Sequence, residues 1–172
     1  FGEASAEHAS DVLELWDQVK LAEGAAADAP AGLLDGVPTS FPALMQAQKL
    51  SRKAASAGFE WDSLSDVWDK VGEEIAELKE AYELAPKTAK GKVDADAPAS
   101  AALQATGISP DQAVADVEME FGDVLFSLVN VARRMGIDSE QALRQCCTKF
   151  RHRWAAMEQA CVAQGKRIED LS

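Results

Sequence analysis

Apolar residues recur every three or four positions over long stretches of this 172-residue chain, and this periodicity constrains its fold most strongly. One such run follows Trp61, with large apolar side chains at Leu64, Val67, Val71, Ile75, Leu78 and Tyr82. Side chains at this spacing lie on one face of an α-helix. Abundant Ala and few aromatic residues also favour helices. The sequence therefore predicts an all-α fold.

Five helices are expected, joined partly by short turns. They cover residues 5–23, 40–57, 63–82, 109–135 and 138–164. The expected N-caps are Ser40, Asp62 or Ser63, Ser109, and Asp138 or Ser139. Glycines that follow the apolar runs, such as Gly58 and Gly136, are the expected helix stops.

The chain divides into an N-terminal helix and linker over residues 1–39 and one helical domain over residues 40–172. Residues 85–110 are rich in Ala, Lys, Asp and Pro, and we expect a flexible insert there. The long amphipathic helices favour a four-helix-bundle-like core. Because one chain has too few helices to cover these apolar stripes, a homodimer is expected, and a tetramer made from two dimers stays open.

Charge and hydropathy exclude several classes of function. The formal net charge of −12 argues against nucleic-acid binding, which needs a field of Lys and Arg. No stretch has the length and apolarity of a membrane span, and residues 1–3 do not begin a signal peptide. Three cysteines without metal-type spacing suit a reducing compartment. A cytoplasmic protein is the expectation.

Two acidic pairs with a spacing of three stand on the third and fourth predicted helices. If the apolar stripe of the third helix centres on Ile75, Glu74 lies about 60° and Glu77 about 120° from it. The fourth helix is treated in the same way, with its core-facing stripe at Phe121, Leu125, Leu128 and Ala132. Glu120 and Asp123 then lie about 100° and about 160° from that stripe. All four acids are expected to border the core.

Two adjacent helices with such pairs can bring four carboxylates to one place. A hard divalent cation can hold four ionised acids together, and oxygen ligands without Cys or His favour Mg²⁺ or Mn²⁺ over Zn²⁺. The simpler interpretation is that the acids are solvated charges, with Lys79 and Arg133 as surface partners. A di-iron carboxylate protein is the least favoured reading, because neither motif has a His three residues after its Glu.

Several segments resemble the MazG family of nucleoside triphosphate pyrophosphohydrolases. The acidic segments are KVGEEIAELKE at 70–80 and EMEFGDVLFSLVNVARRMG at 118–136. FPALMQAQKLSRKAASAGFEW at 41–61 looks like the family's first core helix, and KFRHRW at 149–154 like its basic last helix. SAEHASDVLELWDQVK at 5–20 is similar to the segment that joins the two halves of double-domain members. The resemblance covers nearly the whole chain except about residues 85–113.

The resemblance implies a dimeric helical bundle that converts a nucleoside triphosphate and water into the monophosphate and pyrophosphate, with nucleotide-pool housecleaning as its role. The implied Mg²⁺ ligands are Glu74, Glu77, Glu120 and Asp123. Glu73 is implied to orient or deprotonate the attacking water beside Glu74. The implied contacts to the triphosphate are Lys70, Lys149 and Arg153, with Asn130 at the polar position after the second acidic motif.

Gln48 and Trp61 are further candidates, for holding the base or sugar, although a Trp after a helix stop is more often a core anchor. No residue gives a clear signature for one base. A narrower hydrolase for dUTP or dCTP and a non-catalytic helical dimerisation module therefore stay as alternatives.

Overall fold

The computed structural model describes residues 32–170, and the regular structure in this range is helical. Its elements are α2 (Ala43–Ser56), α3 (Leu64–Leu84), α4 (Ala101–Thr106), α5 (Pro110–Arg134), α6 (Ser139–Ala163) and a 3₁₀ turn at Ile168–Asp170. Within these residues the β-type pairing is a single bridge between Lys87 and Val93. The predicted all-α class is confirmed. The predicted helix over residues 5–23 lies outside the described residues.

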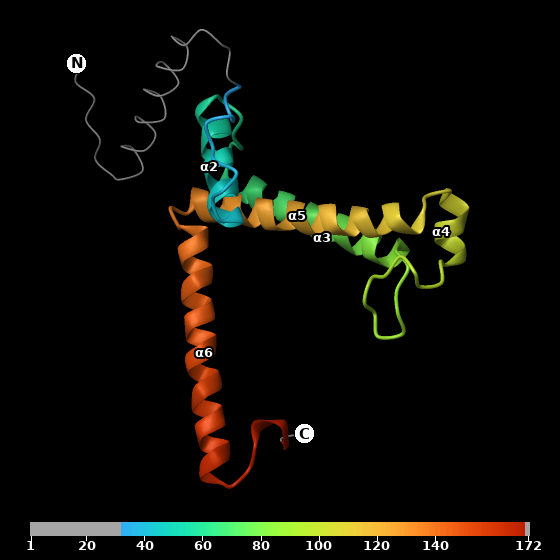
Figure 1. Cartoon of the computed structure of the whole chain (residues 1–172). Coiled ribbons are helices and arrows are strands. Elements are labelled where there is room, and N and C mark those ends of the chain that lie inside the picture. The colour runs from blue at the N-terminus through green and yellow to red at the C-terminus, as the bar shows by residue number, and fades with distance from the viewer. Residues whose placement is uncertain (1–31, 171–172) are drawn as a thin grey trace, which may run out of the picture.

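The pair formed by α3 and α5 is the centre of the described fold. The two helices lie side by side, α2 packs across one end of α5, and α6 leaves the same end and runs away from the pair (Figure 1). Contacts between Val71 and Val131 at one end and between Ala85 and Ala113 at the other make α3 and α5 antiparallel. None of the helices within residues 32–170 has the length and apolarity needed to cross a membrane.

Capping residues set most of the helix starts. Ser63 forms a capping box with Asp66, in which the Asp66 amide donates to the Ser63 hydroxyl (3.2 Å) and the Ser63 amide donates to the Asp66 carboxylate (2.8 Å). Ser109 and Asp138 cap α5 and α6, as predicted. The prediction for Ser40 is wrong: α2 begins at Ala43 after Pro42, which offers no capping side chain.

A small apolar core holds the two central helices together where α2 crosses them. Val67 and Val71 of α3 pack with Val131 of α5, and Trp61 packs against this cluster with Leu64 and Ile75. The rings of Phe59 and Trp61 meet edge to face with their centroids 6.4 Å apart. Trp61 is therefore a core anchor at the α2–α3 turn.

A polar network connects α2, the α2–α3 turn and α5. The buried hydroxyl of Ser51 donates to the Asn130 side-chain oxygen and accepts from Arg133 Nε at 2.7 Å. The Arg133 guanidinium also holds both carboxylate oxygens of Glu60, at 2.6 and 2.8 Å. Since the Arg133 side chain is 11% exposed, its interpretation as a surface partner is wrong. Arg134 extends the network by donating to the Trp61 carbonyl at 3.0 Å.

The orientation of α5 differs from the prediction. The expected core stripe at Phe121, Leu125, Leu128 and Ala132 is wrong for the single protomer, because Phe121 is 55% exposed and Leu125 and Leu128 also face outward. Val124 and Val131 are buried instead, together with Ser127 and Asn130. The periodicity of apolar residues did not predict this rotation, because the buried face of α5 includes the polar residue Asn130. The Asn130 side chain can be buried since it forms hydrogen bonds with Ser51 and with the Phe126 carbonyl.

Residues 85–110, expected to be a flexible insert, contain a turn closed by the Lys87–Val93 bridge and the short helix α4. Leu103 is almost fully buried against Ala85 and Ala113. The Tyr82 hydroxyl donates to the Gly91 carbonyl at 2.8 Å. Leu103 and two small residues, Ala85 and Ala113, thus form a satellite core, which the composition of this segment did not predict.

The Glu60–Arg133 pair makes stability depend on pH. Burial alone would raise the pKa of Glu60, but hydrogen bonds from Arg133 and from the Trp61 amide, with the charges of Arg133 and Arg134, hold this pKa below its ordinary value. A lowered folded-state pKa stabilises the protein above the unfolded-state pKa, and this contribution is lost as pH falls through the folded-state pKa.

We therefore expect Glu60→Gln to lower the free energy of unfolding by about 1–2 kcal/mol at neutral pH, because one charge-assisted pair is lost. The difference from the unsubstituted protein should shrink on acidification. Urea unfolding followed by circular dichroism from neutral to acidic pH measures both effects. Asp62→Asn, two residues away on the exposed surface, is the control. A difference that stays constant with pH would contradict this account.

Candidate active site

Three predicted metal ligands meet between α3 and α5. One carboxylate oxygen from each of Glu74, Glu77 and Glu120 lies within 4.8 Å of the other two. Glu74 and Glu77 come from consecutive turns of α3, and the antiparallel packing of α5 brings Glu120 opposite them. The structure thus brings together three of the four predicted ligands from two helices far apart in the sequence.

Glu74 is the buried member of this cluster, with 7% exposure. Glu74 was predicted to lie at the border of the core, but it lies on the buried face of α3 together with Val67 and Val71. Lys70, one turn earlier, donates to Glu74 at 2.8 Å and lies 3.3 Å from Glu73. The hydrogen bond to Glu74, followed by the one to Glu73 and the nearby charges, raises the pKa of Lys70 to about 12 against the effect of burial.

The carboxylates repel one another across the helix pair. The pKa of Glu120 is raised, first by loss of solvation and then by the negative charges of Glu77, Asp123 and Glu74, with Asp116 adding a smaller effect. Asp123 is exposed and stands outside the group of three, but its charge acts on Glu120. A cation placed among these oxygens would relieve this repulsion.

The donor set fits a hard divalent cation. The three clustered side chains offer carboxylate oxygens, the charge of a fourth carboxylate, Asp123, acts on Glu120, and neither Cys nor His belongs to the group. Mg²⁺ and Mn²⁺ prefer such oxygen ligands, and Mg²⁺ retains several waters when few side chains hold it. The residues therefore fit the cation that the sequence predicted.

The other predicted site residues are dispersed. The side chain of Glu73 is 64% exposed and pairs with Lys70 outside the three-acid cluster. Asn130 is 2% exposed within the Ser51 network, and Gln48 joins α2 to the α5–α6 corner through Ser139 and the Ile137 carbonyl. In this protomer Trp61, Asn130 and Gln48 make structural contacts, and their contact with substrate stays a prediction.

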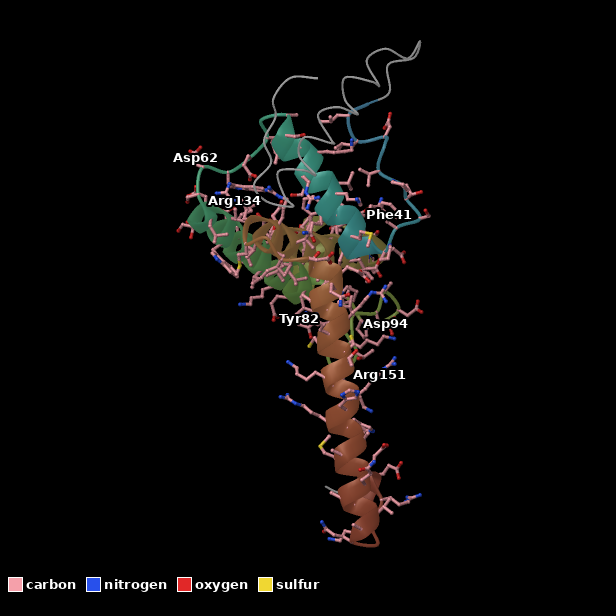
Figure 2. All side chains as sticks on the ribbon, turned by 90° about the vertical axis from the view of Figure 1, so that its left-hand side faces the viewer. Phe41, Asp62, Tyr82, Asp94, Arg134 and Arg151 are labelled. Carbon is pink, nitrogen blue, oxygen red and sulfur yellow. The ribbon has the colours of Figure 1, made fainter. Side chains whose placement is uncertain are left out.

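Lys149 and Arg153 lie on the exposed surface of α6, one turn apart. Figure 2 shows the side chains along α6, Arg151 among them, extending into open space beyond the helices that carry the acids. Neither Lys149 nor Arg153 is among the charges that shift the pKa of Glu120. Within one protomer, the structure does not bring these two cations to the acidic cluster.

The residues that fix α5 against α2, among them Ser51 and Glu60, were not predicted from the sequence. A Ser within a helix and a Glu in a turn are common on surfaces, and their partners lie 79 and 73 positions away. Their contribution is positional, since they set the rotation of α5 and hence the direction in which Glu120 points.

The described residues form an all-α domain in which acids from two antiparallel helices meet at one point, as in helical proteins that hold a hard cation with carboxylates. A family model described as the MazG nucleotide pyrophosphohydrolase domain matches residues 70–156, which include all four acids and the basic part of α6. The chain belongs to the MazG family.

Three curated relatives support this membership. The nucleoside triphosphate pyrophosphohydrolase of Escherichia coli (strain K12) is 39% identical over 165 residues, which are 96% of this chain and 53% of that protein. The nucleoside triphosphate pyrophosphohydrolase/pyrophosphatase MazG of Thermotoga maritima is 32% identical over 130 residues, covering 76% of this chain and 39% of that protein. The uncharacterized protein YabN of Bacillus subtilis is 36% identical over 172 residues, all of this chain and 29% of that protein. The chain thus spans about half or less of the length of these relatives.

Repulsion within the cluster gives a test in the metal-free protein. Because the folded-state pKa of Glu120 is raised, its stabilising contribution is present below the unfolded-state pKa and is lost as pH rises through the folded-state pKa. We expect Glu120→Gln to raise the melting temperature of the EDTA-treated protein at neutral pH, and this gain should shrink as pH falls toward the unfolded-state pKa of the carboxyl group. Thermal unfolding followed by circular dichroism measures this.

Glu118→Gln is the matched control, since it removes an equal charge from an exposed position of α5 two residues away. Glu118→Gln should leave the pH dependence of the melting temperature unchanged. Equal melting curves for Glu120→Gln and the unsubstituted protein at every pH would show that repulsion at Glu120 is negligible.

Proposed function

We propose that this chain is the catalytic part of a Mg²⁺-dependent nucleoside triphosphate pyrophosphohydrolase, which releases nucleoside monophosphate and pyrophosphate. The observation that carries the proposal is the convergence of Glu74, Glu77 and Glu120 within 4.8 Å in a domain of the MazG family. The E. coli and T. maritima relatives are named nucleoside triphosphate pyrophosphohydrolases, which supports the reaction. The proposed role is housecleaning of the nucleotide pool in the cytoplasm, which suits the three free cysteines.

In this proposal Glu74, Glu77, Glu120 and Asp123 hold the cation, for which Mn²⁺ is the expected substitute. Bound there, Mg²⁺ would supply charge neutralisation for the triphosphate and lower the pKa of coordinated water. Glu73, exposed beside the cluster, is the candidate to accept a hydrogen bond from the attacking water and hold it in line with the phosphorus. Water then attacks the α phosphorus and forms the new P–O bond of the nucleoside monophosphate, while its proton passes to Glu73 or to solvent. The bond from the α phosphorus to the bridging oxygen breaks, and pyrophosphate leaves with the bonding electron pair.

The proposed active unit is a homodimer. Exposed apolar side chains run along α5 at Phe121, Leu125, Leu128 and Met135, and along α6 at Leu143, Phe150, Trp154 and Met157. The α6 positions recur at intervals of seven, four and three, so they share one face of the helix. A helix of 25 residues that buries only Cys161 needs tertiary cover to be stable in water.

Charge indicates how the second copy is placed. At about 100° per residue, Lys149 and Arg153 lie beside the apolar stripe of α6, about 100° and about 60° from Phe150. If this stripe packs against the exposed apolar stripe of α5 in the second copy, both cations approach the acidic cluster of that copy. Within its own chain, the cluster has Lys70 as its neighbouring cation. We therefore assign Lys149 and Arg153 to the triphosphate bound at the opposite protomer, where they complete the charge balance. A further pairing into a tetramer is compatible with this arrangement.

Product analysis tests the reaction. Incubation with each NTP, with dUTP or dCTP, and with Mg²⁺ should release nucleoside monophosphate and pyrophosphate. Glu74→Gln and Asp123→Asn should each lower kcat by about 10²-fold or more, since each removes a ligand, with unchanged helical content by circular dichroism. Glu80→Gln, an exposed acid of α3, is the control. Release of diphosphate and inorganic phosphate, or no turnover, would reject the proposal, and a sharp preference for dUTP or dCTP would select the narrower activity.

Mixing two inactive variants tests the dimer. Glu74→Gln removes the acidic site, and the double variant Lys149→Gln/Arg153→Gln removes the basic residues of α6. If one protomer supplies cations to the acids of the other, each heterodimer has one intact site of two, and a co-refolded equimolar mixture with random pairing regains about a quarter of the activity of the intact protein. Equal activity of mixed and separate samples would place both groups in the same protomer.

Light scattering tests the proposed interface itself. Phe150→Glu on the apolar stripe should shift the mass from dimer to monomer, because a charge would be buried against α5. Val162→Glu is the matched control, since Val162 is 73% exposed on the same helix but off the stripe. A dimer that persists in Phe150→Glu would refute this interface.

A further inference from the structure

Lys70 occupies an unusual position for a basic residue of a nucleotide site, because it is held by the acids rather than turned toward open solvent. Its ammonium group lies 2.8 Å from Glu74 and 3.3 Å from Glu73. The side chain of Glu74 is 9% exposed, while that of Lys70 is 34% exposed. The ion pair thus joins a buried carboxylate to an ammonium group that keeps a route to solvent.

Glu74 needs a cationic partner when no metal is bound. A buried carboxylate without one is strongly destabilising, since its lost hydration is not replaced. Among residues 32–170, Lys70 is the one cation within ion-pair distance of the three clustered acids. The order Lys then Glu at a spacing of four is the less favourable one in isolated helices, so burial of Glu74 is the main reason for this pair.

We propose that Lys70 is the resident counter-ion of the carboxylate site, and that it exchanges Glu74 for the phosphate chain when a divalent cation binds. This inference rests on the proposed function, because it takes Glu74 as a metal ligand. The Lys70 ammonium lies 2.8 Å from Glu74, and a divalent cation held by the same carboxylate would repel it, so metal binding weakens the Lys70–Glu74 pair. The ammonium group, on a flexible stem with a path to solvent, is then free for an anion.

The exchange assigns two opposite effects to one side chain. Before substrate binds, Lys70 competes with the cation for Glu74 and weakens metal binding. Once the cation is bound, Lys70 is released from the buried Glu74, keeps the exposed Glu73 as its neighbour, and strengthens nucleotide binding. Tight metal binding is thereby coupled to the presence of the triphosphate, which replaces Glu74 as the partner of the ammonium group. A residue with a purely structural role would change both affinities in the same direction.

The test is Mn²⁺ binding to the full chain at constant ionic strength, measured by electron paramagnetic resonance and by calorimetry. Without nucleotide, Lys70→Gln should bind Mn²⁺ about fivefold to tenfold more tightly than the unsubstituted protein, which corresponds to the loss of one competing charge-assisted hydrogen bond. With Mn²⁺ bound, the same variant should bind a non-hydrolysable triphosphate analogue at least about fivefold more weakly than the unsubstituted protein does. Lys70→Arg, which keeps the charge, should bind Mn²⁺ nearly as weakly as the unsubstituted protein, because its side chain still competes with the cation for Glu74.

Lys79→Gln is the matched control, because it removes the same charge from an exposed position of α3 with no partner in the acidic cluster. It should move neither affinity by more than about twofold, the screened effect of a distant charge. Metal affinity that is unchanged or weaker in Lys70→Gln would overturn the inference, even if the protein hydrolyses nucleoside triphosphates as proposed. A protein that neither binds Mn²⁺ nor releases pyrophosphate would overturn both.

Discussion

Burial of the Glu74 carboxylate between two helices is the constraint on which the rest of the structure depends. A charge at this depth must be paired, and Lys70 on the preceding turn of α3 pairs with it. The facing helix adds Glu120, whose pKa is raised by loss of solvation and by the negative charges of the neighbouring acids. An ordinary structural interface would exclude such an arrangement. It is stable here because Val67, Val71 and Val131 pack α3 against α5, and the Arg133 network fixes α5 in rotation.

Much of this arrangement could be predicted from the sequence because it follows local rules. Apolar spacing gave α3 and α5, and the caps at Ser63 and Ser109 follow from side-chain chemistry within three residues. The spacing of three between Glu74 and Glu77 gave two acids on neighbouring turns. Contacts between distant residues could not be predicted in this way. The bond of Ser51 to Asn130 joins residues 79 positions apart, and either partner alone is an ordinary polar residue.

The orientation of α5 shows a different limit. Its apolar residues occupy more than one face, and hydropathy cannot distinguish a face buried within the protomer from one that a second copy covers. The Leu125 and Leu128 face was predicted to be internal, but the structure buries the Val124 and Ser127 face instead. The satellite core around Leu103 was missed for a related reason, because Ala85 and Ala113 bury well but contribute little to a hydrophobic pattern. Prediction was therefore strongest for the helices that carry the acids and weakest for what packs around them.

The charge balance of the site connects the exposed apolar faces of α5 and α6 to the proposed chemistry. A chain with a net charge of −12 that gathers carboxylates cannot attract a triphosphate by its average field. In the proposed site one divalent cation and Lys70 would offset three of the four acidic charges, and the phosphate chain would bring several further negative charges. The cations on α6 are the remaining group that the sequence associates with the substrate, and in one protomer α6 runs away from the helices that carry the acids (Figure 1). A second copy that covers the apolar stripe of α6 would bury this exposed surface and would also bring the basic residues to the substrate, because these residues border the stripe. The same helix face would then determine assembly and substrate charge, so the isolated protomer would be incomplete in both respects.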